Sequence, residues 1–164
     1  GTLAPWEGFG PRALLTADDC FAGNQCLRLG LNGNDAPDIA SGVHHGRVGE
    51  PGMSVRFSAE VVVDQELVGD TIVELELENV RGSDADDVRR TAVAIAPTRP
   101  GVWRHFSVCA SAPSDLATFM RPVIVIRSPS GKGTGAVRVD NVLIETVARS
   151  CNDFDGFDVD GGCF

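Results

Sequence analysis

Tyrosine is absent from this 164-residue sequence, and tryptophan occurs only 2 times. The absence of tyrosine excludes the tyrosine corner that marks many immunoglobulin-like sandwiches. Positive charge is also scarce, since 14 lysine and arginine residues stand against 23 aspartate and glutamate residues and give a net charge of -9. This balance argues against partners such as nucleic acid and anionic membranes. No run of residues approaches the ~20 apolar positions that a membrane-spanning helix needs, so we predict no membrane span.

Sequence motifs of catalysis are missing as well. The chain has no G-x-S-x-G nucleophile elbow, no H-E-x-x-H zinc motif, no P-loop and no recognisable cysteine and histidine pair of a thiol enzyme. Two of the many carboxylates could face each other as in a glycosidase, but a sequence does not show their separation. We therefore predict that the protein is not an enzyme and has no catalytic residues.

The five cysteines indicate the redox environment. Cys20 and Cys26 flank a turn-forming segment, and Cys151 and Cys163 bracket a glycine-containing tail, so each pair could close a local loop. We predict these two disulfides, an oxidising environment outside the cell, and a buried thiol at Cys109. The alternative is five reduced thiols in a cytosolic domain. The spacings C-x5-C and C-x11-C disfavour a zinc site.

Apolar and polar residues alternate along most of the chain with the period of two that is typical of strands. The expected strands cover 13–16, 25–31, 42–48, 54–64, 72–80, 88–96, 102–109, 122–128 and 135–147. Turns rich in glycine and proline separate them, and no convincing helix appears. We predict an all-β fold, a two-sheet antiparallel β-sandwich of jelly-roll type, with an immunoglobulin sandwich as the second choice.

The composition changes near the C-terminus. We assign residues 1–147 to one β-sandwich domain and residues 148–164 to an acidic, cysteine-bracketed tail. Carboxylates at alternate positions in this tail are similar to Asp-rich calcium loops, although the twelfth-position glutamate of an EF-hand is missing. The other interpretation is a solvated acidic tail.

Asp140 is the most unusual residue of the last expected strand. It is surrounded by Val137, Val139, Val142 and Ile144. An ionised carboxylate in an apolar strand is costly unless it is paired, hydrogen-bonded or bound to a metal. Asp140 is therefore expected to have a specific partner.

Four segments in chain order carry a family resemblance. They are 6–9 (WEGF), 57–61 (FSAEV), 101–107 (GVWRHFS) and 137–142 (VRVDNV). In this order they are typical of the galactose-binding-like jelly roll, and over roughly residues 5–147 the chain resembles carbohydrate-binding modules of the family 4, 9 and 22 type. The resemblance implies a non-catalytic module that binds a polysaccharide or oligosaccharide. It also implies a secreted or surface protein of several domains, of which this chain is one part.

The resemblance further implies a structural calcium ion. In such modules a glutamate near the N-terminus and the aspartate of the last strand commonly bind Ca²⁺, and here those positions are Glu7 and Asp140. Side-chain oxygens of Asp18, Asp19 or Asn24 could complete the six to eight oxygen ligands that calcium prefers. The alternative is that Asp140 accepts backbone hydrogen bonds or pairs with an arginine, without an ion.

For the sugar itself, the resemblance points to a cleft on one sheet. Sugar rings stack on exposed aromatic rings, which leaves Trp6 as a platform or a core residue, while Trp103 is expected in the core. Polar side chains that could bind hydroxyl groups lie on the charged faces of the strands. The candidate ligand-binding residues are Trp6, His45, Arg47, Glu76 and Arg127.

A second function stays open at this point. A charged outer face is also what any solvated antiparallel sheet needs, and the chain has few aromatic residues to stack on a sugar. A calcium-stabilised structural or adhesion domain of the same fold, without glycan binding, is the alternative.

Overall fold

The structure of the protein, a computed structural model, describes residues 6–81, 88–95, 100–112, 114, 118–147 and 151. Its regular elements are all strands, and no helix in the described part is long and apolar enough to cross a membrane. The strands are β1 (Trp6–Phe9), β2 (Ala13–Thr16), β3 (Cys26–Asn32), β4 (Ile39–His45), β5 (Ser54–Val68), β6 (Ile72–Arg81), β7 (Val88–Ala94), β8 (Arg104–Ser111), β9 (Thr118–Ser128) and β10 (Thr134–Val147).

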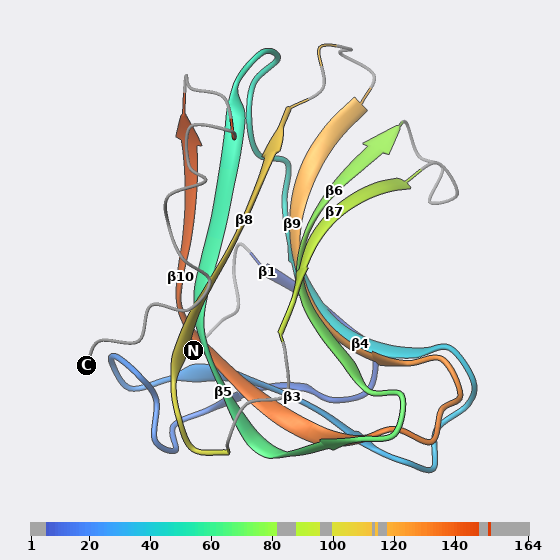
Figure 1. The fold of residues 1–164 in the computed structure, drawn as a ribbon. Helices are drawn as coiled ribbons and strands as arrows, with labels where there is room; N and C mark the ends of the chain where they lie inside the picture. The colour runs from blue at the N-terminus through green and yellow to red at the C-terminus, as the bar shows by residue number, and fades with distance from the viewer. Residues whose placement is uncertain are drawn as a thin grey trace.

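The ten strands form two five-stranded antiparallel sheets that pack face to face (Figure 1). The front sheet has the order β1-β4-β9-β6-β7, and the back sheet has the order β2-β3-β10-β5-β8. Neighbouring strands in a sheet are mostly not consecutive in the chain, so the chain crosses repeatedly between the sheets. The predicted all-β sandwich of jelly-roll type is confirmed.

The core lies between the inner faces of the two sheets, and the alternation in the sequence accounts for it. On β6, Leu75 and Leu77 are fully buried, and on β5 the side chains of Val55, Phe57 and Ala59 have no exposed area. Each strand therefore contributes every second residue to one apolar layer, as its period of two predicts. The other residues of each strand lie on the outer faces, where the sites described below are built.

Two disulfides tie loops to the back sheet. Cys20 pairs with Cys26, with Cα atoms 5.5 Å apart, and this predicted disulfide is confirmed. Cys109 pairs with Cys151 across 5.6 Å, so the predictions of a Cys151–Cys163 bond and of a buried thiol at Cys109 are wrong. Cys163 lies outside the described residues.

The correction has a simple physical reason. Cys109 lies on the outer face of β8, between the buried Val108 and Ala110, and is only half-buried. Cys151, which follows β10 in the chain, lies within bonding distance of Cys109. The spacing of cysteines in the sequence indicates only pairs that close short local loops, whereas these two are 42 positions apart.

The two disulfides are expected to stabilise the fold unequally, because the entropy that a disulfide removes from the unfolded chain grows with the loop it closes. The loops here span 42 and 6 positions. Replacing Cys109 and Cys151 together by serine should lower the free energy of unfolding by about 4 kcal/mol, and replacing Cys20 and Cys26 by about 2 kcal/mol. Urea unfolding of both double variants measures the difference, and equal losses would contradict this account.

Candidate functional site

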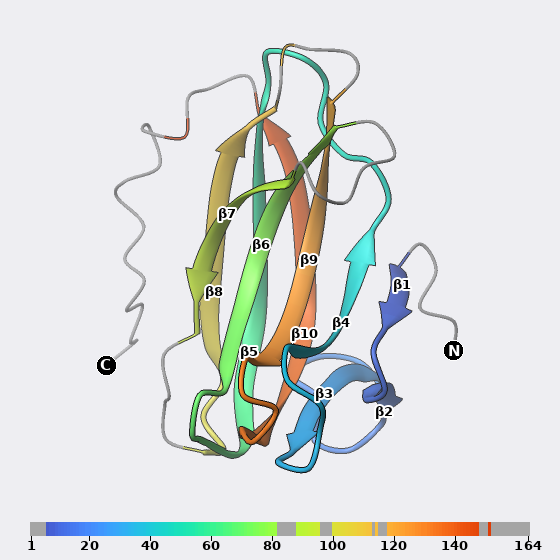
Figure 2. The same ribbon diagram turned by 90° about the vertical axis from the view of Figure 1, so that its right-hand side faces the viewer.

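The outer face of the front sheet is hollow. The front sheet curves away from the back sheet at both ends (Figure 1), and Figure 2 looks onto this concave face. A cavity of about 340 Å³ opens on it. We call it the cleft, and its lining residues are Phe9, Ala40, His44, Glu76, Glu78, Arg90, Arg121, Val123, Val125 and Arg127.

The floor of the cleft follows from the register of three strands. Val123 and Val125 on β9 lie opposite His44 and Gly42 on β4, and on their other side opposite the glutamates of β6. Both valines are on the outer face of the sheet, yet they are only 4% and 3% exposed. Their burial shows that the neighbouring side chains rise above them as walls, so the cleft has an apolar floor.

One wall consists of two rings. The ring of Phe9 on β1 stacks on that of His44, with centroids 6.1 Å apart and planes 24° from parallel. A Cβ atom at Gly42 would lie 2.8 Å from the Phe9 ring, so the glycine leaves the space in which this ring lies across β4. The cleft therefore has a half-buried phenyl ring at its edge.

The opposite wall is a network of charges. Glu76 and Glu78 on β6 are 1% and 5% exposed, and arginines of the two neighbouring strands cover them. The contacts are Arg90 Nε to Glu78 Oε1 at 2.9 Å and to Glu76 Oε2 at 3.5 Å, Arg121 Nε to Glu78 Oε2 at 2.7 Å, Arg127 Nη2 to Glu76 Oε1 at 3.0 Å, and an ion pair between Arg127 and Glu74. The burial of two carboxylates is thus compensated by cations from β7 and β9.

Glu76 is the least satisfied member of this network. Arg127 Nη2 is close to its Oε1 atom, but the geometry is not that of a hydrogen bond, and this buried oxygen has no hydrogen-bond partner. Burial, followed by repulsion from Glu78, raises the pKa of Glu76 from 4.5 to about 7, against the attraction of Arg90. A buried carboxyl group with a raised pKa and an oxygen that accepts no hydrogen bond is typical of a functional site when it lies in a cleft.

Only two of the five predicted ligand-binding residues, Glu76 and Arg127, lie in the cleft. The ring of Trp6 contacts Phe57 of the core, with centroids 6.0 Å apart, and contacts His45 edge-on at 5.1 Å. Trp6 and His45 therefore lie on the inner side of β1 and β4. Arg47 lines a separate surface pocket with Gly49, Glu50, Pro51, Met53 and Thr146.

The cleft residues absent from the prediction are mainly the partners of the predicted ones. Phe9 and His44 occupy the outer face where Trp6 and His45 had been expected, because alternation along a strand places each neighbour on the opposite side. Glu78, Arg90 and Arg121 complete the charged wall. Their signal was present in the sequence as alternating charges, but the strand order that brings β7 and β9 beside β6 was not.

Trp103 is also placed differently from the prediction. It lies half-buried beside Phe21, with ring centroids 5.7 Å apart, and the guanidinium of Arg138 lies 5.8 Å from its ring centre. The expected core position is therefore wrong. The tryptophan instead packs next to the loop between β2 and β3.

The two main predicted calcium ligands, Glu7 and Asp140, contact other groups of the protein. Glu7 Oε2 lies 3.8 Å from His44 Nε2 in the front sheet, whereas Asp140 belongs to the back sheet. The two Asp140 oxygens accept backbone N–H groups of Ala22, at 2.8 Å, and Asn141, at 2.7 Å. Within the described ranges, no three or more His, Cys, Asp or Glu side chains form a group that could hold a metal ion. Asp19 and Asn24 lie on the same β2–β3 loop, and the calcium site at Glu7 and Asp140 stays a prediction.

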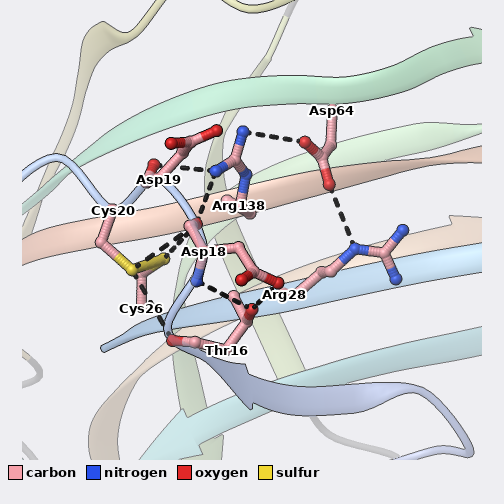
Figure 3. Close-up of polar contacts among 8 residues, drawn as sticks. All are labelled: Thr16, Asp18, Asp19, Cys20, Cys26, Arg28, Asp64 and Arg138. Carbon is pink, nitrogen blue, oxygen red and sulfur yellow. Dashed lines mark hydrogen bonds and ion pairs between the residues drawn. A yellow bond between two sulfur atoms is a disulfide. The ribbon is translucent and has the colours of Figure 1, made fainter. Parts of the chain in front are cut away.

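A side-chain cation holds the β2–β3 loop instead (Figure 3). Arg138 Nη1 donates hydrogen bonds to the carbonyl oxygens of Asp18, at 2.6 Å, and Asp19, at 2.8 Å, while its Nη2 pairs with Asp64 at 2.9 Å. Arg28 pairs with the other Asp64 oxygen at 3.1 Å. The β2–β3 loop, which contains the Cys20–Cys26 disulfide, is therefore anchored to β10 by Arg138 and Asp140.

Comparisons with known proteins agree on the fold. No protein-family model matches the chain, and no curated protein matches it. Solved structures do: the CBM22-2 xylan-binding domain from Paenibacillus barcinonensis Xyn10C matches with a TM-score of 0.64 at 14% identity, over 90% of this chain and 94% of that one. The C-terminal family 22 carbohydrate-binding module of Clostridium thermocellum Xyn10B matches with a TM-score of 0.60 at 20% identity, over 90% and 89%. TmCBM61, solved with β-1,4-galactotriose, matches with a TM-score of 0.58 at 10% identity, over 88% and 90%. The chain thus has the fold of carbohydrate-binding modules, as the resemblance implied.

The raised pKa of Glu76 gives an expected pH dependence of stability. In the unfolded chain this carboxyl group titrates near its ordinary 4.5, and in the folded protein near 7, so between these values the folded state binds more protons. The free energy of unfolding should therefore fall by about 2–3 kcal/mol as the pH rises from about 5 to about 8, given ~1.4 kcal/mol per pKa unit.

The substitution Glu76→Gln should remove most of that fall, whereas Glu66→Gln, at an exposed position of β5, should leave it unchanged. Urea unfolding at several pH values measures both variants. If the free energy of unfolding of the Glu76→Gln variant depends on pH as strongly as that of the wild type, a group other than Glu76 causes the pH dependence.

Proposed function

We propose that this protein is a non-catalytic carbohydrate-binding module that binds a polysaccharide chain in the cleft of the front sheet. The observation that carries the proposal is the cleft itself, which has an aromatic ring on one wall and buried, hydrogen-bonding charges on the other. This is the combination that sugars require, since a pyranose ring has an apolar face and a rim of hydroxyl groups. Structures of the same fold that are titled xylan-binding or hold β-1,4-galactotriose support the ligand class.

The two walls of the cleft would contact different parts of the sugar. The Phe9 ring would take the apolar face of one sugar unit, with His44 behind it. Arg90, Arg127 and Glu76 would exchange hydrogen bonds with the hydroxyl groups, since guanidinium and carboxylate groups are strong partners for them. No catalytic role is assigned to the glutamates, because each of them is held by arginines in the wall of the cleft.

The setting of the module belongs to the proposal as well. Two disulfides favour an oxidising compartment, and we infer a secreted or surface protein in which this module accompanies other domains. Such a module would hold its partner domains against a polysaccharide.

A structural or adhesion domain of the same fold is the second candidate. Among the residues that the structure describes, Phe9 is the one phenyl or indole ring that lines the cleft, and most of the charges there are already paired with one another. A domain that contacts protein and not sugar would need no more than this.

Titration calorimetry with soluble xylan and with β-1,4-galactan decides between the two. We expect binding of at least one of these polysaccharides, and we expect Phe9→Ala to weaken it about tenfold through the loss of the stacked ring. Phe21→Ala, which removes an equally large ring exposed near the back sheet, is the matched control and should bind as the wild type does. If neither these nor other β-linked polysaccharides bind to the folded wild type, the adhesion candidate replaces the proposal.

Calcium is a separate part of the proposal, carried over from the resemblance. If an ion stabilises the module, EGTA should lower the melting temperature and Ca²⁺ should restore it, because a ligand that binds the folded state raises its stability. Thermal melting of the wild type and of Asp140→Ala tests this. An Asp140→Ala variant that melts lower while the wild type ignores EGTA would leave the two backbone hydrogen bonds, worth about 1–3 kcal/mol together, as the whole role of Asp140.

A further inference from the structure

The strongest unexplained feature of the described residues is an oxygen of Glu76 that is buried and accepts no hydrogen bond. The side chain is 1% exposed and its Oε1 atom has no hydrogen-bond partner, yet Glu76 is one of the residues that line the cleft. A buried acceptor without a donor costs about 1–3 kcal/mol. Natural structures rarely leave such a group unsatisfied unless a ligand or water supplies the missing donor.

The surroundings of Glu76 define what that donor can be. The charged and titratable groups that face it are Glu74 and Glu78 on its own strand, Arg121 and Arg127 on β9, Arg90 on β7, and His44 with Glu7 in the same cross-strand row. Three arginines balance three glutamates in this wall. A neutral hydroxyl group can donate a hydrogen bond to Glu76 Oε1 and leaves this balance of charges unchanged. An ionised carboxylate of an acidic sugar has no proton to donate and would add a negative charge that the three arginines, already paired with glutamates, do not balance.

The arginines do not already fill the role of donor. Arg90 donates its hydrogen bond to Glu78 and only approaches the other oxygen of Glu76, at 3.5 Å. Arg127 donates to Glu74, and its Nη2 atom lies 3.0 Å from Glu76 Oε1 as an ion pair without the geometry of a hydrogen bond. Glu76 Oε1 can therefore still accept a hydrogen bond from a group that enters the cleft.

We propose that Glu76 Oε1 accepts a hydrogen bond from a hydroxyl group of a neutral sugar unit in the cleft, and that this bond makes Glu76 the residue that selects neutral over acidic polysaccharides. The inference rests on the proposed function and adds to it the charge class of the ligand. It also ties affinity to pH, because an ionised carboxylate accepts a hydroxyl group more strongly than a protonated one, and Glu76 ionises near pH 7.

The test uses titration calorimetry with xylohexaose as the neutral probe and an oligogalacturonide of similar length as the acidic one, between about pH 5.5 and about pH 8.5. For the wild type, we expect the affinity for xylohexaose to rise about tenfold over this range, as a charge-assisted hydrogen bond forms, and the oligogalacturonide to bind more weakly throughout.

The variant Glu76→Gln keeps the shape of the side chain and removes its charge. This variant should bind xylohexaose about tenfold more weakly than the wild type at about pH 8.5, and its affinity should no longer rise with pH. The ratio of its affinity for xylohexaose to its affinity for the oligogalacturonide should be smaller than in the wild type. Any pH dependence that comes from His44 persists in this variant, so the difference between the two profiles belongs to Glu76. Glu66→Gln is the control outside the cleft and should match the wild type.

Each outcome separates this inference from the proposed function. Wild-type affinity and an unchanged pH profile in the Glu76→Gln variant would overturn the inference while leaving the carbohydrate-binding module intact. Tighter binding of the acidic probe by the wild type would also overturn it. Failure of the wild type to bind any polysaccharide would overturn the proposed function, and the inference with it. The pH profile of the wild type alone tests the inference should the variant fold poorly.

Discussion

The strict alternation of side chains along β6 is the constraint on which the site depends. Leu75 and Leu77 enter the core, so Glu76 and Glu78 must occupy the other face of the same strand. Because that face is concave, both carboxylates are buried there as well. A buried carboxylate needs cations beside it, and the two strands next to β6 supply them. The charged wall of the cleft is thus a consequence of where one strand lies in the sheet.

The parts of this structure that could be predicted are those that depend on patterns within short stretches of the sequence. A period of two identifies most strands and their inner residues, and it gave the sandwich, the core face of β6 and the cleft position of Glu76. The short Cys20–Cys26 loop was predictable for the same reason. In each case the information lies within about ten consecutive residues.

The parts that could not be predicted depend on pairing between distant segments. β1 has only four residues, so its sequence shows no clear period, and its pairing with β4 decides that Phe9 and not Trp6 faces the cleft. The bond between Cys109 and Cys151 likewise joins two segments that are 42 positions apart in the chain. Asp140 was identified as a residue in need of a partner, but its partner, the amide of Ala22, is 118 positions away.

The Cys109–Cys151 bond also changes how the domain responds to mechanical force. Tension applied to the chain beyond residue 151 would enter the sheet through the disulfide into the outer face of β8, and would bypass the end of β10. The force would then be shared among β8, β5 and β10, which are paired side by side. β8 is the edge strand of the back sheet, so this load would act first on its pairing with β5, whereas β10 is held on both sides by β3 and β5. The strand at which force enters the sheet therefore depends on whether the disulfide is intact, and so on the redox state of the surroundings.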